Sequence, residues 1–167
     1  MLFFPVQGQT CHAYCTYCFR WAQFVGNKDL RFAARNVDQV AEYLRLHSEV
    51  SDVLITGGDP MIMSSSRIRA VVEPLLEPDL EHVRSIRMGT KSLAFWPYRF
   101  LTDEDADDLM RLFEEIRRTG RQIALMAHFS HPRELETRAV EDAIRRVRDA
   151  GVVIRTQAPI IRHVNDR

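Results

Sequence analysis

Lysine and cysteine are both scarce in this chain of 167 residues. It has two lysines, Lys28 and Lys91, and three cysteines. It has no run of about 18 apolar residues, so no membrane span is expected. Its start has no basic residues followed by a long apolar stretch, so no secretory signal is expected either. The sequence therefore predicts a cytoplasmic protein.

The chain also lacks an excess of positive or negative charge. Lys+Arg and Asp+Glu both number 23, which gives a formal net charge of zero. The basic pairs lie among acidic residues on predicted helices, as on a solvated helix face. A polyanion such as nucleic acid is therefore not expected as a partner. The length indicates one domain, residues 1–167.

Apolar runs alternate with amphipathic segments along the sequence. Strands are predicted at residues 2–6, 52–56, 85–88, 122–129 and 152–156, and helices at 36–49, 64–76, 102–118 and 134–150. Asn36, one of the serines at 64–66 and Thr102 are the predicted helix caps, with Thr102 and Asp105 resembling a capping box. Repeated strand–helix units with buried-type strands predict an α/β fold with a parallel sheet.

Five strands are too few for a closed eight-stranded barrel. Either a partial TIM-like barrel or an open doubly wound sheet fits the pattern, and both place chemistry at the C-terminal ends of the strands. Five segments follow the predicted strands: the cysteine loop, residues 56–60, residues 89–91, residues 128–131 and Gln157. We expect all five to meet at one edge of the sheet.

The three cysteines, Cys11, Cys15 and Cys18, lie within eight residues. An odd number so closely spaced is a poor disulfide framework and is more typical of metal binding. Three thiolates on one loop can hold three irons of a [4Fe–4S] cluster and leave the fourth iron open to a small molecule. The alternative is a zinc site completed by His12 or a distant histidine, although zinc motifs usually contain Cys-x2-Cys pairs.

Several other residues have readings from the sequence alone. Gly57 and Gly58 allow the backbone to approach a ligand closely, and the Asp59 carboxylate and neighbouring carbonyls can accept hydrogen bonds from an ammonium. A plain strand-to-loop turn is the alternative. His128 and His131 form only a weak metal pair, and a helix N-terminus held by Ser130 or His131 is the alternative. Tyr17 can pack beside the cluster or an adenine, or serve in plain packing, and Arg20 is either a surface residue or a carboxylate ligand.

Five segments together resemble one known family. They are residues 11–20 (Cys-His-Ala-Tyr-Cys-Thr-Tyr-Cys-Phe-Arg), 54–60 (Leu-Ile-Thr-Gly-Gly-Asp-Pro), 86–90 (Ile-Arg-Met-Gly-Thr), 128–132 (His-Phe-Ser-His-Pro) and 151–166. The Cys-x3-Cys-x2-Cys spacing after a first strand resembles the radical S-adenosylmethionine (SAM) superfamily. The order of all five is similar to lysine 2,3-aminomutase and its relatives.

This resemblance implies a function. A reduced [4Fe–4S] cluster on the three cysteines would cleave SAM, and the 5′-deoxyadenosyl radical would abstract hydrogen from an amino acid, leading to a 1,2-amino shift. The residues implied in SAM binding are Gly57, Gly58, Asp59, His128 and Gln157, and Arg20 matches the arginine that holds the substrate carboxylate. The resemblance also implies an electron donor such as flavodoxin or ferredoxin. A homo-oligomer is left open.

Pyridoxal 5′-phosphate (PLP) is the point at which the resemblance fails. The family uses a lysine to hold PLP, and that lysine lies beyond the region matched here. Lys28 lies in a polar stretch, and at the position of Lys91 relatives tend to have arginine. We therefore expect no PLP lysine in this chain and interpret it as incomplete at its C-terminus. A PLP-independent radical SAM enzyme with another substrate, or a non-catalytic metal-binding module, are the alternatives.

Overall fold

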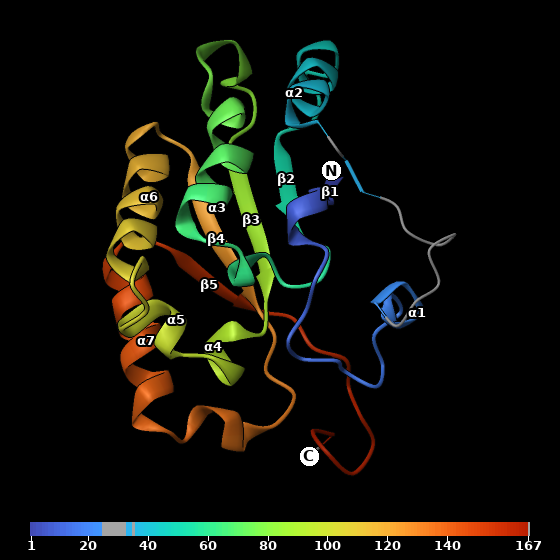
Figure 1. Ribbon diagram of the computed structural model, residues 1–167, viewed down its shortest axis with the longest axis vertical. Helices are drawn as coiled ribbons and strands as arrows, with labels where there is room; N and C mark the ends of the chain where they lie inside the picture. The colour runs from blue at the N-terminus through green and yellow to red at the C-terminus, as the bar shows by residue number, and fades with distance from the viewer. Residues whose placement is uncertain (25–32, 35, 167) are drawn as a thin grey trace.

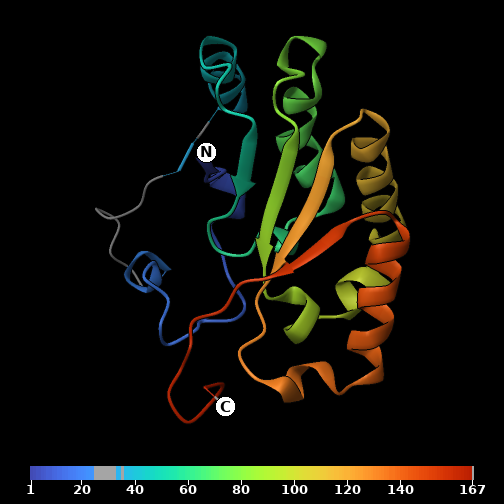
Figure 2. The same ribbon diagram turned by 180° about the vertical axis from the view of Figure 1, so that it is seen from behind.

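Parallel strands in sequential order form one sheet in this computed structural model, which describes residues 1–24, 33–34 and 36–166 (Figures 1 and 2). The strands are β1 (Leu2–Phe3), β2 (Asp52–Ile55), β3 (Ser85–Thr90), β4 (Gln122–Ala127) and β5 (Val153–Thr156). Each neighbouring pair is parallel. A doubly wound sheet would require the strand order to reverse. The order β1-β2-β3-β4-β5 never reverses, so the α/β prediction is confirmed in its partial TIM-like barrel form.

Helices connect the strands, and the α-helices from residue 37 onward contribute buried side chains to one hydrophobic core. The α-helices are α1 (Trp21–Phe24), α2 (Val37–Leu46), α3 (Ser65–Val72), α4 (Ser92–Phe95), α5 (Tyr98–Leu101), α6 (Ala106–Arg118) and α7 (Arg138–Asp149). The 3-10 turns are η1 (Val6–Gly8), η3 (Pro60–Ile62), η4 (Glu73–Leu76), η5 (Pro78–Leu80) and η6 (Pro132–Leu135). None of the helices in the described part of the chain has the length and hydrophobicity that a membrane crossing requires.

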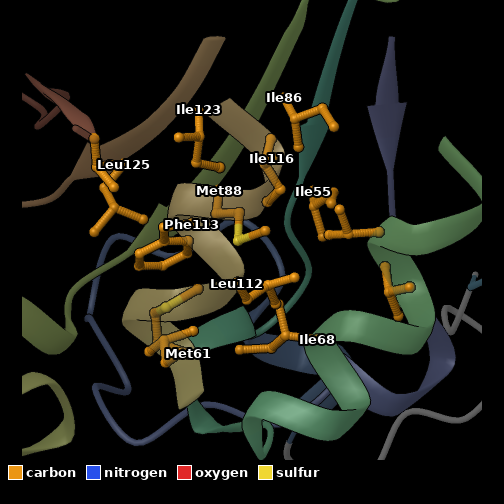
Figure 3. Packing of buried hydrophobic residues seen from close by; sticks show 14 of the residues in the cluster. Ile55, Met61, Ile68, Ile86, Met88, Leu112, Phe113, Ile116, Ile123 and Leu125 are labelled. Atoms are coloured by element: carbon orange, nitrogen blue, oxygen red, sulfur yellow. The ribbon is translucent and has the colours of Figure 1, made fainter. Parts of the chain in front are cut away.

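The main hydrophobic core lies between the sheet and these helices. Figure 3 shows Ile55, Ile86 and Met88 from the strands packed against Phe113 and Ile116 of α6. All five side chains are at most 1% exposed. Burial of such side chains contributes about 1.5–3 kcal/mol each, which makes this layer the main stabilising feature of the fold.

The opposite face of the sheet is only half buried, which differs from the prediction of strands buried on both faces. Burial alternates along β2 and β3, so that Leu54, Arg87 and Gly89 are partly exposed while their neighbours are buried. Arg87 pairs across the strands with Asp52 at 2.5 Å. The helices cover one face, and the other corresponds to the interior side of a barrel wall. This face leads to the candidate functional site.

The predicted capping box at Thr102 and Asp105 is wrong. Thr102 ends α5, one of two short helices between β3 and α6 that the sequence did not predict. Asp105 precedes α6 but makes no capping bond with its side chain. Its carboxylate instead accepts hydrogen bonds from the Ser65 backbone and from Arg99, whose side chain is 1% exposed. A buried guanidinium needs a partner, and this need takes Asp105 away from the helix end.

The side chains of Asn36 and Ser64 cap their helices, as predicted, and Thr137 caps α7. The Thr137 hydroxyl accepts a hydrogen bond from the backbone N–H of Val140 at 3.3 Å. We expect Thr137→Ala to lower the free energy of unfolding by about 1 kcal/mol, because it leaves a helix donor without its partner. Thr102→Ala is the matched control and should cost only a few tenths. Urea unfolding of both variants measures the difference, and equal costs would contradict the assignment.

Candidate functional site

A cavity of about 580 Å³ opens at the C-terminal ends of the strands. Residues from all five segments that follow the predicted strands line it, so the prediction that these segments meet at one edge is confirmed. The residues that the resemblance implies in cluster, SAM and substrate binding all line this cavity: Cys11, Cys15, Cys18, Arg20, Gly57, Gly58, Asp59, His128 and Gln157. Figures 1 and 2 show the cysteine loop and the C-terminal segment side by side beyond the strand ends.

The cysteine loop carries three free, partly buried thiols. The Cys18 backbone N–H donates to the Cys15 carbonyl at 3.0 Å, which closes a tight turn between these two residues. Tyr14, just before Cys15, has a φ of 44°. A non-glycine residue in this left-handed region is uncommon and costs energy, and such positions concentrate at functional sites. The loop therefore holds its thiols in a shape that the backbone would not adopt alone.

The donor set fits a group that takes one thiolate per metal atom. Within the described ranges, no three His, Cys, Asp or Glu residues gather closely enough to hold a single metal ion. A [4Fe–4S] cluster makes no such demand, because each thiolate binds a different iron. Three thiols facing one cavity suit a cluster of this kind.

The Cys11 thiol has a raised pKa. Burial is the main cause, and the nearby Asp59 and Cys15 charges add to it, while hydrogen bonds from the Ala13 and Tyr14 backbone oppose it. A thiol must lose its proton before it can bind a metal, so any metal bound by these thiols would release protons on binding and be held more weakly as the pH falls.

Gly57 and Gly58 approach the cysteine loop itself. The Gly58 N–H donates to the Gly8 carbonyl at 2.9 Å, and the Asp59 N–H donates to the Thr10 carbonyl at 2.8 Å. A Cβ added at Gly58 would lie 1.7 Å from the Thr10 oxygen, and Gly57 has a φ of 151°. The two glycines thus allow the backbone of residues 8–10 to come close to the turn after β2. This contact docks the cysteine loop against that turn.

The Asp59 carboxylate, which is 2% exposed, is engaged by protein donors. One oxygen accepts from Met61 N at 3.0 Å and from the Thr90 hydroxyl at 2.7 Å. The other accepts from Lys91 N at 2.7 Å. His12 Nε2 lies 4.0 Å away. These bonds tie the turn after β2 to the turn after β3, which leaves backbone carbonyls as the acceptors that this turn can offer to an ammonium.

His128 lies in a small polar group at the end of β4. Its Nε2 is 2.9 Å from the Tyr17 hydroxyl and 3.2 Å from the Ser130 hydroxyl, and its ring stacks on Tyr17 with centroids 5.5 Å apart. Burial lowers the pKa of His128, the positive charge of Lys91 lowers it further, and Glu134 opposes both. The ring is therefore more often neutral than an exposed histidine near pH 6.5.

His131 does not share this group. Its Nδ1 accepts from the Arg133 backbone N–H at 3.2 Å, so it caps η6, as the helix-cap alternative proposed.

Lys91 is held in an ion pair. Its ammonium lies 2.9 Å from a Glu134 oxygen and 3.1 Å from the Ser130 hydroxyl, and it sits 4.5 Å from the centre of the Phe95 ring. The residue is 5% exposed. A Schiff-base lysine must present a free amine to the cofactor aldehyde, which this arrangement does not do. Lys28 lies outside the described residues.

Arg20 is buried at the edge of the cavity. Its guanidinium donates to Gln9 Oε1 at 2.6 Å and to Gln23 Oε1 at 2.7 Å, and it stacks over the Phe4 ring at 4.5 Å. Burial lowers the pKa of Arg20, although the neighbouring Cys18 opposes this. A guanidinium held in one orientation loses little conformational freedom when it binds a carboxylate.

Gln157 is an exposed residue of the cavity lining, and its backbone N–H donates to the Ala127 carbonyl at 3.0 Å, next to the end of β4.

Several known proteins are similar to this chain over most of its length. No protein-family model matches the sequence. A protein of Aquifex aeolicus, provisionally named an L-lysine 2,3-aminomutase, is 40% identical over 93% of this chain and 40% of its own length. L-lysine 2,3-aminomutase of Fusobacterium nucleatum is 30% identical over 93% of the chain and 34% of its own length. The chain is a partial-length member of the lysine 2,3-aminomutase-like family of radical SAM proteins.

The family's named members differ in substrate. Glutamate 2,3-aminomutase of Clostridioides difficile is 28% identical to this aminomutase-like chain over 93% of the chain and 34% of its own length. The chain thus spans less than half the length of the relatives it matches.

Sequence reasoning missed several residues of this aminomutase-like site. Gln9 and Gln23 hold Arg20, and Ser130 and Glu134 hold Lys91. These partners are ordinary polar residues at ordinary positions. The only indication in the sequence was the position of Lys91, which directly follows a predicted strand in a chain with two lysines.

Proposed function

We propose that this chain binds a [4Fe–4S] cluster through Cys11, Cys15 and Cys18 and takes part in radical SAM chemistry on an amino acid. The main support for the proposal is that these cysteines line one cavity at the strand ends together with Arg20 and the other predicted site residues. When bound, the cluster supplies the electron that cleaves SAM to methionine and the 5′-deoxyadenosyl radical. Its reductant would be a small electron carrier such as flavodoxin or ferredoxin.

Other residues around the cavity are the proposed ligands of SAM. In this proposal, carbonyls of the Gly57–Gly58 turn accept hydrogen bonds from the SAM ammonium, because the Asp59 carboxylate is already engaged. His128 and Gln157 bind the nucleoside part from the ends of the neighbouring strands β4 and β5. Each follows a different strand, so together they fix the orientation of SAM relative to the cysteine loop.

Arg20 is the proposed ligand of the substrate carboxylate. The matched relatives are named for lysine and for glutamate, which share an α-carboxylate and an α-ammonium and differ in the side chain. A residue that binds the shared part fits both. The reaction proposed for the full-length protein is a 1,2-amino shift, and Lys91 does not serve it as a PLP lysine because its ammonium is paired with Glu134.

Anaerobic reconstitution with iron and sulfide tests the proposal. We expect a brown protein with about four irons per chain that forms 5′-deoxyadenosine from SAM after reduction with dithionite. Iron analysis, the visible spectrum and chromatography of the nucleoside measure these results. A colourless protein that binds one zinc ion and produces no 5′-deoxyadenosine would establish the metal-binding module instead.

A further inference from the structure

The buried ammonium of Lys91 links two loops at the rim of the cavity. Lys91 follows β3, and its partners Glu134 and Ser130 belong to the loop between β4 and α7. Its Nζ also lies 3.4 Å from the His128 carbonyl. Glu134 closes the arrangement by accepting from the Ser130 N–H at 3.1 Å. The Lys91 ammonium therefore contacts three residues of one loop, namely His128, Ser130 and Glu134.

The contacts continue from this loop to the cysteines. The Ser130 hydroxyl lies 2.5 Å from the Tyr17 hydroxyl, which is in turn hydrogen-bonded to His128. Tyr17 stands between Cys15 and Cys18. We call the group of Tyr17, Lys91, His128, Ser130 and Glu134 the Lys91 network. It runs from the turn after β3, through the loop after β4, to the cysteine loop.

Apolar packing does little to fix the loop that carries His128. Its 3-10 turn, η6, buries none of its residues, and Leu135 is 41% exposed. Phe129 packs against the core but is only partly buried. A loop with so little buried apolar surface opens easily unless polar contacts hold it. The Lys91 ion pair is the most buried of these contacts, with the lysine side chain 5% and the Glu134 side chain 19% exposed.

We propose that Lys91 is a positioning residue, which through Ser130 and Glu134 fixes the loop after β4 so that His128 stacks on Tyr17 beside the cysteine loop. The inference rests on the proposed function in one respect, namely that His128 lies in the SAM pocket. In this role Lys91 holds a loop in place and does not attach a cofactor. The role explains why a cation is found at this position although it does not serve PLP chemistry.

The charges around His128 make the idea testable without a cluster. Tyr17 faces the ring from the cysteine loop, Lys91 faces it from the turn after β3, and Glu134 faces it from η6. Burial and the Lys91 charge lower the pKa of His128, whereas the Glu134 charge raises it. Removing the positive charge and removing the negative charge must therefore move this pKa in opposite directions, as long as the loop stays in place.

Three variants of the whole chain provide the test: Lys91→Met, Glu134→Gln and Lys91→Arg. NMR titration of the His128 ring in the reduced, metal-free protein measures the pKa. We expect Lys91→Met to raise it, because the charge is lost and the loop is released to solvent. Glu134→Gln should lower it, since the amide oxygen can still accept from Lys91 and Ser130. Lys91→Arg keeps the charge and should leave the pKa lowered. An unchanged pKa in Lys91→Met, or a raised one in Glu134→Gln, would overturn the proposal.

SAM binding provides the second measurement. In reconstituted protein, Lys91→Met should keep its iron content and bind SAM about tenfold more weakly, the size of effect typical of residues that orient a ligand-binding group. Lys91→Arg should restore binding. Unchanged affinity in Lys91→Met would refute the role. If the unaltered protein binds no cluster, the proposed function fails, and the titration alone then decides whether Lys91 positions the loop.

Discussion

Cys15→Ala is expected to yield a chain that cannot assemble a [4Fe–4S] cluster. Two remaining thiolates cannot hold a cubane that also keeps one iron open. Cys15 is central to the loop, because its carbonyl accepts the hydrogen bond that closes the turn to Cys18. After anaerobic reconstitution and desalting, we expect the brown colour and the bound iron to be lost and no 5′-deoxyadenosine to form. Visible absorption and iron analysis per chain measure the loss.

His12→Phe is the matched control for this prediction. His12 follows Cys11 directly, and its ring lies 6.3 Å from Phe95 and 6.2 Å from Trp96 between ring centroids. Phenylalanine keeps a ring in this place and removes both ring nitrogens, so it eliminates His12 as a metal ligand. We expect this variant to assemble the full cluster. If Cys15→Ala keeps the cluster spectrum, or if His12→Phe loses it, the ligand assignment is wrong.

Gly58→Ala is the substitution expected to damage the fold of the site most. The added Cβ would lie 1.7 Å from the Thr10 oxygen and 2.3 Å from the Thr10 carbonyl carbon, and neither backbone atom can move as a flexible side chain would. We expect the free energy of unfolding to fall by more than about 3 kcal/mol, above the usual range for overpacking. The cysteine loop should also undock, so that its thiols react faster with a thiol reagent.

Gly120→Ala separates this collision from the cost of an unusual backbone conformation. Gly120 has a φ of 84°, and nothing lies within 4 Å of a Cβ added there. Alanine at Gly120 should cost about 1 kcal/mol through strain alone and should leave thiol reactivity unchanged. Urea unfolding and the rate of thiol modification compare the two variants. Equal thiol reactivity in Gly58→Ala and the unaltered protein would show that the loop does not depend on this contact.

The regular part of the fold could be predicted because its signals are local. Apolar alternation along the chain indicates strands and helices within a few residues, and the helix caps Asn36 and Ser64 act on donors two or three residues away. Parallel strands then place their C-terminal ends at one edge. The meeting of the site residues at one cavity follows from this rule without any knowledge of side-chain contacts.

The features that could not be predicted depend on side-chain and backbone contacts that only the tertiary structure makes. Asp105 looks like part of a helix cap until Arg99, buried beneath η3, takes its carboxylate. Gly58 looks like a glycine required for a ligand alone until the Thr10 backbone is found against it. Lys91 has no partner that the sequence indicates until Glu134 is brought beside it. In each case the partner is an ordinary residue, and only the tertiary structure pairs it.

Docking of the cysteine loop on the turn after β2 sets an order of assembly during synthesis. The loop leaves the ribosome first, but Gly8 and Thr10 find their partners Gly58 and Asp59 only after a complete strand–helix unit has followed. Until then the three thiols belong to an unanchored segment that is open to oxidation or to the wrong metal. Assembly of the proposed cluster would therefore follow the synthesis of the second strand, and until then the nascent chain needs a reducing environment or a carrier that shields its cysteines.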